Sequence, residues 1–256
     1  MHSERIEFGG ASGQLLSGRL ETPEGRLRGQ ALFAHCFTCG KDSIAAYRIA
    51  RALARRGISV LRFDFTGLGD SGGDFGNTNF TSNVGDLVAA AVHLRGLGRP
   101  AGLLIGHSLG GAAVLAATRH LPEVRAVATI AAPSDPAHVA GLFQGAGPAE
   151  EDGGAVQVTL GGRSFRIQRQ FLADAAEYPL MRDIASLGRA LLVLHSPVDE
   201  VVEIAHATRI FMAAAHPRSF VSLDRASHLL TGRGEAAYAA DVIAAWSTRY
   251  LRADVV

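Results

Sequence analysis

The sequence predicts an α/β fold in which a mostly parallel central sheet carries helices on both faces. Apolar runs short enough to be buried strands alternate with amphipathic runs of helical length over residues 30–132, and again over residues 190–251. Such alternation is typical of parallel strands joined by crossover helices. Hydrophobic residues make up 48% of the 256 residues and charged residues 19%, which is enough apolar material for a large core. We therefore expect residues 1–256 to form a single domain.

The first half of the chain starts with two short strands and continues into the alternation. Gly9, Gly10 and Gly13 separate two apolar runs and predict an antiparallel pair at 6–8 and 15–20. Gly57 ends the first amphipathic run, and Ser82 or Asn83 is expected to cap the next helix. The strands expected after the pair are 30–34, 58–63 and 103–105, and the helices are 44–56 and 84–97.

The second half interrupts this alternation once. Residues 134–185 have no regular strand–helix pattern, and the runs 155–160 and 164–167 around Gly161 and Gly162 predict a β-hairpin. Because the alternation resumes afterwards, we interpret 134–185 as a small cap inserted into the main domain. The remaining elements expected are strands at 124–132, 190–194 and 219–223, and helices at 203–215 and 235–251.

The segment Gly106-His107-Ser108-Leu109-Gly110 fits the pattern G-x-S-x-G between a predicted strand and a predicted helix. A serine on so tight a turn has a strained backbone, and side chains two positions away on either side would collide, which explains the two glycines. The following helix directs its N–H groups and positive dipole end toward the turn. Ser108 is therefore our candidate nucleophile, although a serine that merely caps the helix would fit the same pattern.

A serine hydroxyl needs an adjacent base, and in strand–turn–helix sites of this kind an acid and then a histidine follow the serine in the chain. Asp199 directly follows the strand expected at 190–194, and His228 directly follows the strand expected at 219–223. The carboxyl ends of parallel strands gather at one edge of a sheet, so we expect both near Ser108. Glu200 and Asp224 are rival acids.

The chain holds 10 histidines, which makes the choice of base a real one. We expect His107 to point away from the nucleophile and His195 to shape the loop that carries Asp199. His120, His206 and His216 lie on or after helices, where surface positions are expected.

Acyl transfer also requires two N–H donors for the oxyanion. The pattern assigns one to Leu109, the residue after the nucleophile, and the other to the loop after the strand at 30–34, which is His35-Cys36-Phe37.

The two cysteines, Cys36 and Cys39, have C-x-x-C spacing, which suggests either a redox pair or half of a metal site. The absence of a second ligand pair argues against zinc. We expect buried, unreactive thiols, and we expect a Cys36–Cys39 link to twist the loop and misplace the Phe37 amide.

Taken together, the Gly106–Gly111 turn, the Asp199 and His228 loops and His35-Cys36-Phe37 resemble the α/β-hydrolase superfamily over nearly the whole chain. Residues 62–73 resemble compact bacterial esterases that include cinnamoyl and feruloyl esterases, in which a His-Gly-Phe loop supplies an oxyanion donor from its Phe. The resemblance implies Phe37 as that donor, with Cys36 in the place of the usual glycine. Residues 33–42 further resemble the hydrolase halves of bacterial proteins fused to an OsmC-like domain.

This resemblance implies a serine esterase for small to medium acyl esters, with Ser108, His228 and Asp199 as triad, Phe37 and Leu109 as oxyanion donors, and no cofactor or metal. Alternatives are a thioesterase, a cofactor-free perhydrolase, or a non-catalytic redox module that uses the two cysteines. A net charge of +1 without charged blocks gives no reason to expect nucleic acid or a membrane as partner. A polar N-terminus without a signal peptide leads us to expect a cytoplasmic protein.

Overall fold

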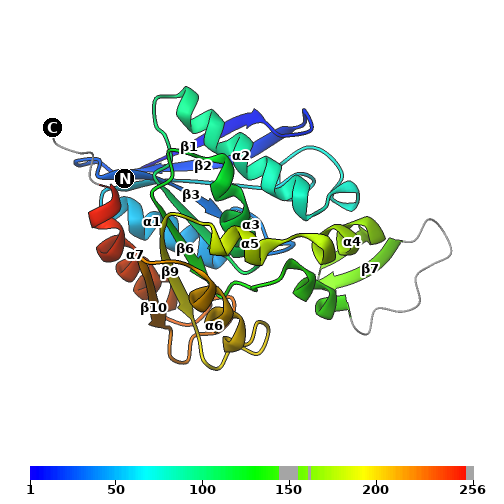
Figure 1. Cartoon of the computed structure of the whole chain (residues 1–256). Coiled ribbons are helices and arrows are strands. Elements are labelled where there is room, and N and C mark those ends of the chain that lie inside the picture. The colour runs from blue at the N-terminus through cyan, green and yellow to red at the C-terminus, as the bar shows by residue number, and fades with distance from the viewer. Residues whose placement is uncertain (144–154, 161–162, 252–256) are drawn as a thin grey trace.

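The computed structural model describes residues 1–143, 155–160 and 163–251, and for 142–143, 155–160 and 163–166 the backbone alone. Its centre is an eight-stranded sheet (Figure 1). The first two strands are antiparallel to their neighbours, and every other pairing is parallel, as the sequence predicts. The strands in their order across the sheet are β1 (His2–Gly9), β2 (Leu15–Thr22), β4 (Ile58–Phe63), β3 (Gly29–Ala34), β5 (Leu103–His107), β6 (Ala126–Ile130), β9 (Ala190–His195) and β10 (Arg218–Ser222).

Helices cover both faces of this sheet, and each face has its own apolar core. The helices α1 (Ile44–Arg55) and α7 (Glu235–Leu251) pack against each other on one face. The strand β5 in the middle is buried along its whole length, because both faces are covered. The other face carries α2 (Phe80–Gly96), α3 (Leu109–Ala117), α5 (Leu180–Ala185) and α6 (Ile204–Ala213).

The segment predicted as a cap projects beside the sheet (Figure 1). It contains the predicted hairpin, formed by β7 (Ala155–Leu160) and β8 (Arg163–Gln168), and then α4 (Arg169–Glu177). The Asp174 carboxylate of α4 accepts hydrogen bonds from the Thr81 N–H and hydroxyl, at 2.8 and 2.7 Å, and so attaches the segment to the start of α2. The short 3₁₀ helices are η1 (Phe75–Asn77), η2 (Thr118–His120) and η3 (Pro136–Phe143).

Two predictions about residues on helices are wrong. The helix α2 begins at Phe80 and is capped by Asn79, which forms a reciprocal capping box with Ser82. Ser82 and Asn83, the two predicted caps, therefore both lie inside the helix. His206 is buried instead of lying on the surface, and its ring contacts the N–H and the hydroxyl of Ser134 at 3.1 and 3.0 Å.

No helix in the described residues is both long and apolar enough to cross a membrane.

Candidate active site

Ser108 lies on the sharp turn between β5 and α3, with a φ of 56° that a residue with a side chain seldom adopts. Its N–H donates to the Ile130 carbonyl of β6 at 2.9 Å, which fixes the turn to the sheet. A Cβ on Gly106 would collide with the carbonyl of Gly110, and a Cβ on Gly110 would collide with the carbonyls of Ala34 and His35. The two glycines thus let β5, α3 and the end of β3 approach closely enough to hold Ser108 in this conformation.

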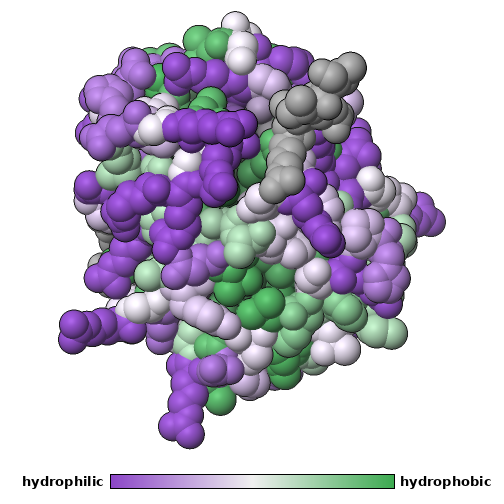
Figure 2. All heavy atoms as spheres, turned by 90° about the vertical axis from the view of Figure 1, so that its left-hand side faces the viewer, coloured by the Kyte–Doolittle hydropathy of each residue, from purple (hydrophilic) through white to green (hydrophobic). Residues whose placement is uncertain are grey.

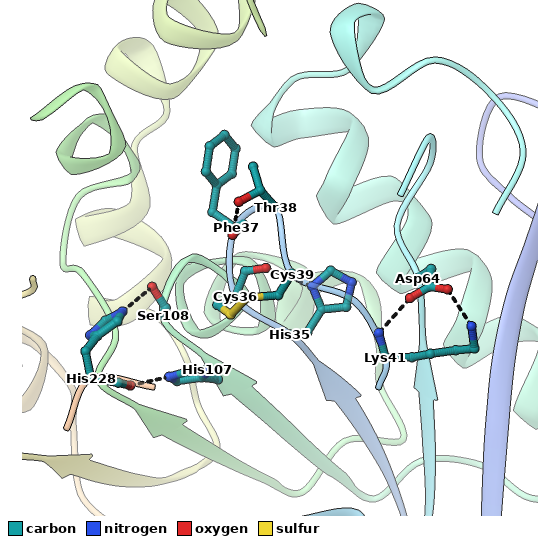
Figure 3. Close-up of a disulfide and its surroundings, with 10 residues drawn as sticks. All are labelled: His35, Cys36, Phe37, Thr38, Cys39, Lys41, Asp64, His107, Ser108 and His228. Carbon is teal, nitrogen blue, oxygen red and sulfur yellow. Dashed lines mark hydrogen bonds and ion pairs between the residues drawn. A yellow bond between two sulfur atoms is a disulfide. The ribbon is translucent and has the colours of Figure 1, made fainter. Parts of the chain in front are cut away.

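The structure brings Ser108, His228 and Asp199 together in one chain of hydrogen bonds. His228 Nε2 lies 3.0 Å from Ser108 Oγ, and His228 Nδ1 lies 2.8 Å from Asp199 Oδ2. Figure 3 shows the His228 ring directed at the serine hydroxyl. The three residues come from loops at the carboxyl ends of β5, β9 and β10, which is the shared edge that the strand order predicts.

Asp199 has the burial and the contacts of the acid in this arrangement, whereas Glu200 and Asp224 are exposed. Its Oδ1 accepts the N–H groups of Val201 and Val202, both at 2.9 Å, so that Oδ2 stays directed at His228. Burial by itself raises the pKa of Asp199, but the hydrogen bonds from His228 and the two amides outweigh burial and lower the pKa overall. The carboxylate is therefore charged at neutral pH.

Two further histidines hold the loops that carry His228 and Asp199. His107 Nε2 lies 2.7 Å from the His228 carbonyl, and His195 Nε2 lies 2.7 Å from the Val202 carbonyl. Burial and the nearby His228 lower the pKa of His107 to about 4, so its ring is neutral at pH 7 and its Nε2–H donates to the carbonyl. His195 shapes the acid loop as expected. The contact of His107 with the His228 carbonyl is a finding of the structure, since the second position of G-x-S-x-G does not specify a partner for its side chain.

Hydrogen bonds within the loop after β3 orient the peptide group between Cys36 and Phe37; Figure 3 shows the residues of this loop. The Cys36 carbonyl accepts hydrogen bonds from His35 Nδ1 at 2.8 Å and from the Cys39 N–H at 3.1 Å. The carbonyl and the N–H of a trans peptide point in opposite directions, so these bonds direct the Phe37 N–H away from the buried His35 ring. Burial lowers the pKa of His35, which keeps the ring neutral and able to donate from Nδ1 alone.

Cys36 and Cys39 form a disulfide across this turn, so the expectation of two unreactive thiols is wrong. The hydrogen bond from Cys39 N–H to the Cys36 carbonyl already brings the two residues together, with Cα atoms 5.3 Å apart. Because the disulfide occurs together with the assembled Ser108–His228–Asp199 chain, it does not disrupt those contacts. It closes the turn that contains Phe37 and Thr38, and Thr38 has a left-handed φ of 57°.

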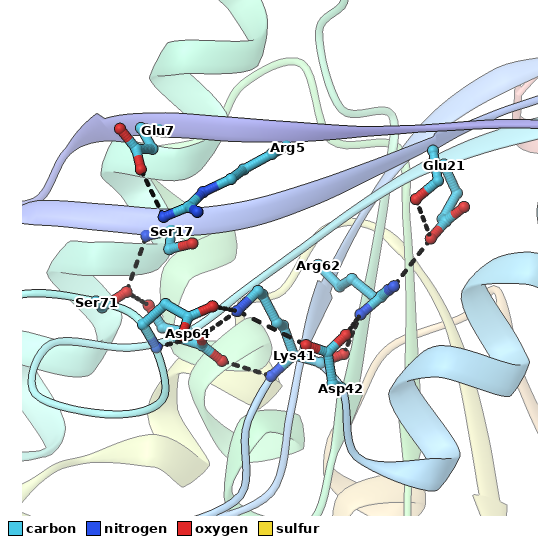
Figure 4. Close-up of polar contacts among 11 residues, drawn as sticks. Arg5, Glu7, Ser17, Glu21, Lys41, Asp42, Arg62, Asp64 and Ser71 are labelled. Atoms are coloured by element: carbon cyan, nitrogen blue, oxygen red, sulfur yellow. Dashed lines mark hydrogen bonds and ion pairs between the residues drawn. The ribbon is translucent and has the colours of Figure 1, made fainter.

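An ionic cluster around the buried side chains of Lys41 and Asp64 anchors the far end of the same loop (Figure 4). Asp64 accepts the Lys41 N–H and the Lys41 ammonium, both at 2.6 Å, and the ammonium also pairs with Asp70 at 2.7 Å. Burial opposes the charge of Lys41, but the ion pairs with Asp64 and Asp70 raise its pKa overall. Arg62 donates to the Lys41 carbonyl at 2.6 Å and pairs with Glu21 at 2.9 Å. Sequence reasoning did not find this cluster, because a lysine in a loop is by default a solvated residue.

A pocket of about 870 Å³ opens beside Ser108 and His228. The disulfide loop, Ile44 at the start of α1, and Val201 and Leu229 form its walls. Phe37 also lines the pocket, and its ring contacts Phe171 of α4 and Phe75, with ring centres 5.2 and 5.6 Å away. The sequence suggests that Leu142, Phe143, Phe165 and Phe171 of the cap form an apolar acyl or alcohol pocket. Phe171 lies next to the site, whereas the side chains of the other three lie outside the described residues.

The family model for the alpha/beta hydrolase family matches residues 31–242, which is most of the chain and includes Ser108, Asp199 and His228. The chain belongs to the alpha/beta hydrolase family. The family and its fold agree with the sheet, the helices and the loop positions described above.

Solved structures add a substantial likeness in sequence. The esterase domain of a protein from Rhodothermus marinus is 47% identical, with a TM-score of 0.81 over 98% of this chain and 100% of that one. Est1E from Butyrivibrio proteoclasticus, solved with ferulic acid, has a TM-score of 0.80 at 16% identity, over 96% and 99% of the two chains. A serine hydrolase without a lid from Xanthomonas campestris has a TM-score of 0.68 at 20% identity, over 99% and 97%. These last two show the fold alone. A search of curated protein sequences finds no match.

Proposed function

We propose that this protein is a serine hydrolase that cleaves carboxylic esters of small to medium acyl groups through an acyl-enzyme. The observation that carries the proposal is the unbroken chain of hydrogen bonds from Asp199 through His228 to Ser108, at 2.8 and 3.0 Å. The likeness at 47% identity to an esterase domain supports the same reaction class.

In the proposed reaction, Ser108 Oγ attacks the carbonyl carbon of the ester while His228 Nε2 takes the hydroxyl proton. Asp199 holds His228 in the tautomer that has its proton on Nδ1, and stabilises the imidazolium that forms. The C–O bond to the leaving alcohol then breaks, and His228 returns the proton to the alcohol oxygen. Water repeats the sequence on the acyl-enzyme and releases the acid and the free Ser108 hydroxyl.

The negative charge that develops on the carbonyl oxygen requires fixed N–H donors, and we assign these to Leu109 and Phe37. The Leu109 N–H belongs to the first turn of α3, whose positive dipole end faces the turn at Ser108. The Phe37 N–H takes its direction from the Cys36 carbonyl, which His35 and Cys39 hold. Removing one such donor costs roughly 10²–10³ in rate in the case studied.

Two finer expectations remain proposals. We propose that the protein lies in the cytoplasm, a compartment in which disulfides are mostly redox-active. We also propose, from the likeness of residues 33–42, that the chain is related to bacterial hydrolases that are fused to OsmC-like domains.

Replacement of the nucleophile tests the function directly. Ser108→Ala removes one hydroxyl and should lower kcat/KM for p-nitrophenyl butyrate by more than about 10⁴-fold, because the loss of a nucleophilic serine costs about 10⁶ in a studied triad. Ser186→Ala makes the same change at an exposed helix end and should leave the rate unaltered. Substantial hydrolysis by a folded Ser108→Ala protein would contradict the proposal.

The choice of acid is tested by a pair of isosteric changes. Asp199→Asn should lower kcat by about 10⁴-fold, the loss seen when a triad aspartate is replaced and the imidazole adopts the wrong tautomer. Asp224→Asn alters an exposed carboxylate and should change kcat only slightly. A larger loss from Asp224→Asn than from Asp199→Asn would mean that the acid is wrongly assigned.

The sequence leads us to expect that a Cys36–Cys39 link misplaces the Phe37 amide. Because the disulfide closes the turn that holds the Cys36 carbonyl, we propose instead that it helps to position the Phe37 N–H. Cys36→Ser with Cys39→Ser, or full reduction of the native protein, should lower kcat for the same ester by less than about 10²-fold and leave KM nearly unchanged, because the donor is loosened but not lost. Thiol titration checks that reduction is complete, and the reductant should have no effect on the double variant. An unchanged kcat in the fully reduced native protein would show that the disulfide does not position this donor.

A further inference from the structure

Four arginines line one groove on the α1–α7 face of the molecule. Arg48, Arg51 and Arg55 come from successive turns of α1, and Arg233 comes from the loop before α7. The groove has a volume of about 530 Å³, and no aspartate or glutamate is among the residues that line it. Figure 2 shows the side of the molecule to which α1 and α7 belong, with hydrophilic side chains over much of its upper and left parts.

These four guanidinium groups have no carboxylate partner among the described residues. Arg51 donates to the Tyr47 hydroxyl within the same helix and lies over its ring. Two carboxylates of α7 are engaged outside the groove, since Glu235 accepts from Ser227 and Gly232, and Asp241 pairs with Arg56. The whole chain has a net charge of only +1, so this concentration of unpaired positive charge is local.

Like charges three and four positions apart on a helix destabilise it when nothing compensates them. Arg48, Arg51 and Arg55 share one face of α1 in this way, and the helix contains no acidic residue. Planar guanidinium groups bind phosphate through paired hydrogen bonds, which makes such a cluster suited to a phosphorylated ligand.

The groove and the pocket of Ser108 are lined by neighbouring residues of α1. Ile44 lines the pocket, and Tyr47 and Arg48 line the groove one helical turn later, on the same side of the helix. On the opposite wall, Leu229 lines the pocket and Thr231 lines the groove. Ile44, Tyr47 and Leu229, which line the pocket or the groove, are all exposed hydrophobic residues.

We propose that the arginine groove binds phosphate groups on the leaving group of the substrate, so that the enzyme acts on acyl esters or thioesters of a phosphorylated alcohol or thiol. At 1.5 Å per residue, Arg48 and Arg55 lie about 6 and 16 Å along the helix axis from Ile44. The substrate therefore carries its phosphates on an extended arm, with the acyl group at Ser108. This inference rests on the proposed hydrolase function and specifies its substrate class.

A matched pair of thioesters tests the inference. Butyryl-coenzyme A and S-butyryl-pantetheine have the same acyl group and the same thiol arm, and butyryl-coenzyme A adds phosphate groups together with an adenosine. We expect kcat/KM to be at least about tenfold higher for butyryl-coenzyme A, a preference of 1.4 kcal/mol. The difference should come mainly from a lower KM for butyryl-coenzyme A. Salt should reduce the preference, since it screens exposed charges.

Arg51→Gln combined with Arg55→Gln should remove most of this preference and leave hydrolysis of S-butyryl-pantetheine and p-nitrophenyl butyrate unchanged. Arg26→Gln combined with Arg99→Gln removes the same charge from exposed positions outside the groove, and should retain the preference. Equal kcat/KM for the two thioesters in the native protein would overturn the inference while leaving ester hydrolysis intact.

Calorimetric titration of the Ser108→Ala protein with free coenzyme A and with pantetheine separates this inference from the catalytic claim. We expect coenzyme A to bind more tightly than pantetheine, and the Arg51/Arg55 change to abolish the difference. If Ser108→Ala still hydrolyses esters, the proposed function fails, and the titration still reports on the groove. Binding of an octaglutamate peptide without binding of coenzyme A would overturn the inference in favour of a protein partner.

Discussion

The strained turn at Ser108 is the constraint on which the other features of the site depend. A φ of 56° is unfavourable for serine, and it persists because Gly106 and Gly110 allow the strand, the helix and the end of β3 to meet without collision. The same close approach places the disulfide loop beside the serine and directs the first turn of α3 toward it. Loss of either glycine would separate all three elements at once.

The loop that contains Phe37 is held at each end by a different interaction. At its start, the Cys36 carbonyl is held by His35 and by the turn that the disulfide closes. At its end, Lys41 is bound by Asp64 through both its backbone and its side chain. An oxyanion donor is most effective when it needs no rearrangement during the reaction. A loop that carries such a donor is therefore expected to be fixed at both ends. The neutral, buried His35 and the charged, buried Lys41 satisfy that requirement by different means.

The parts that could be predicted are those with a local signal. Strand–helix alternation predicts the parallel sheet, and G-x-S-x-G followed by loops after two later strands selects Ser108, Asp199 and His228 as neighbours. The rest depends on contacts between distant segments. The partner of His107 is a carbonyl 121 positions away, His206 is buried against Ser134, and the C-x-x-C spacing does not distinguish paired from free cysteines. The arginines of α1 are indistinguishable from a solvated helix face until Arg233 is placed opposite them.

The central claim is that Ser108 is a nucleophile activated by His228, and covalent labelling measures this most directly. A fluorophosphonate reacts with activated serines, and the site of the adduct is located by mass spectrometry of the digested protein. We expect one adduct per chain, on Ser108, with labelling lost in Ser108→Ala and strongly slowed in His228→Gln, while exposed serines such as Ser186 remain unlabelled. An adduct on another residue would contradict the account. So would full esterase activity in a protein whose Ser108 is completely labelled.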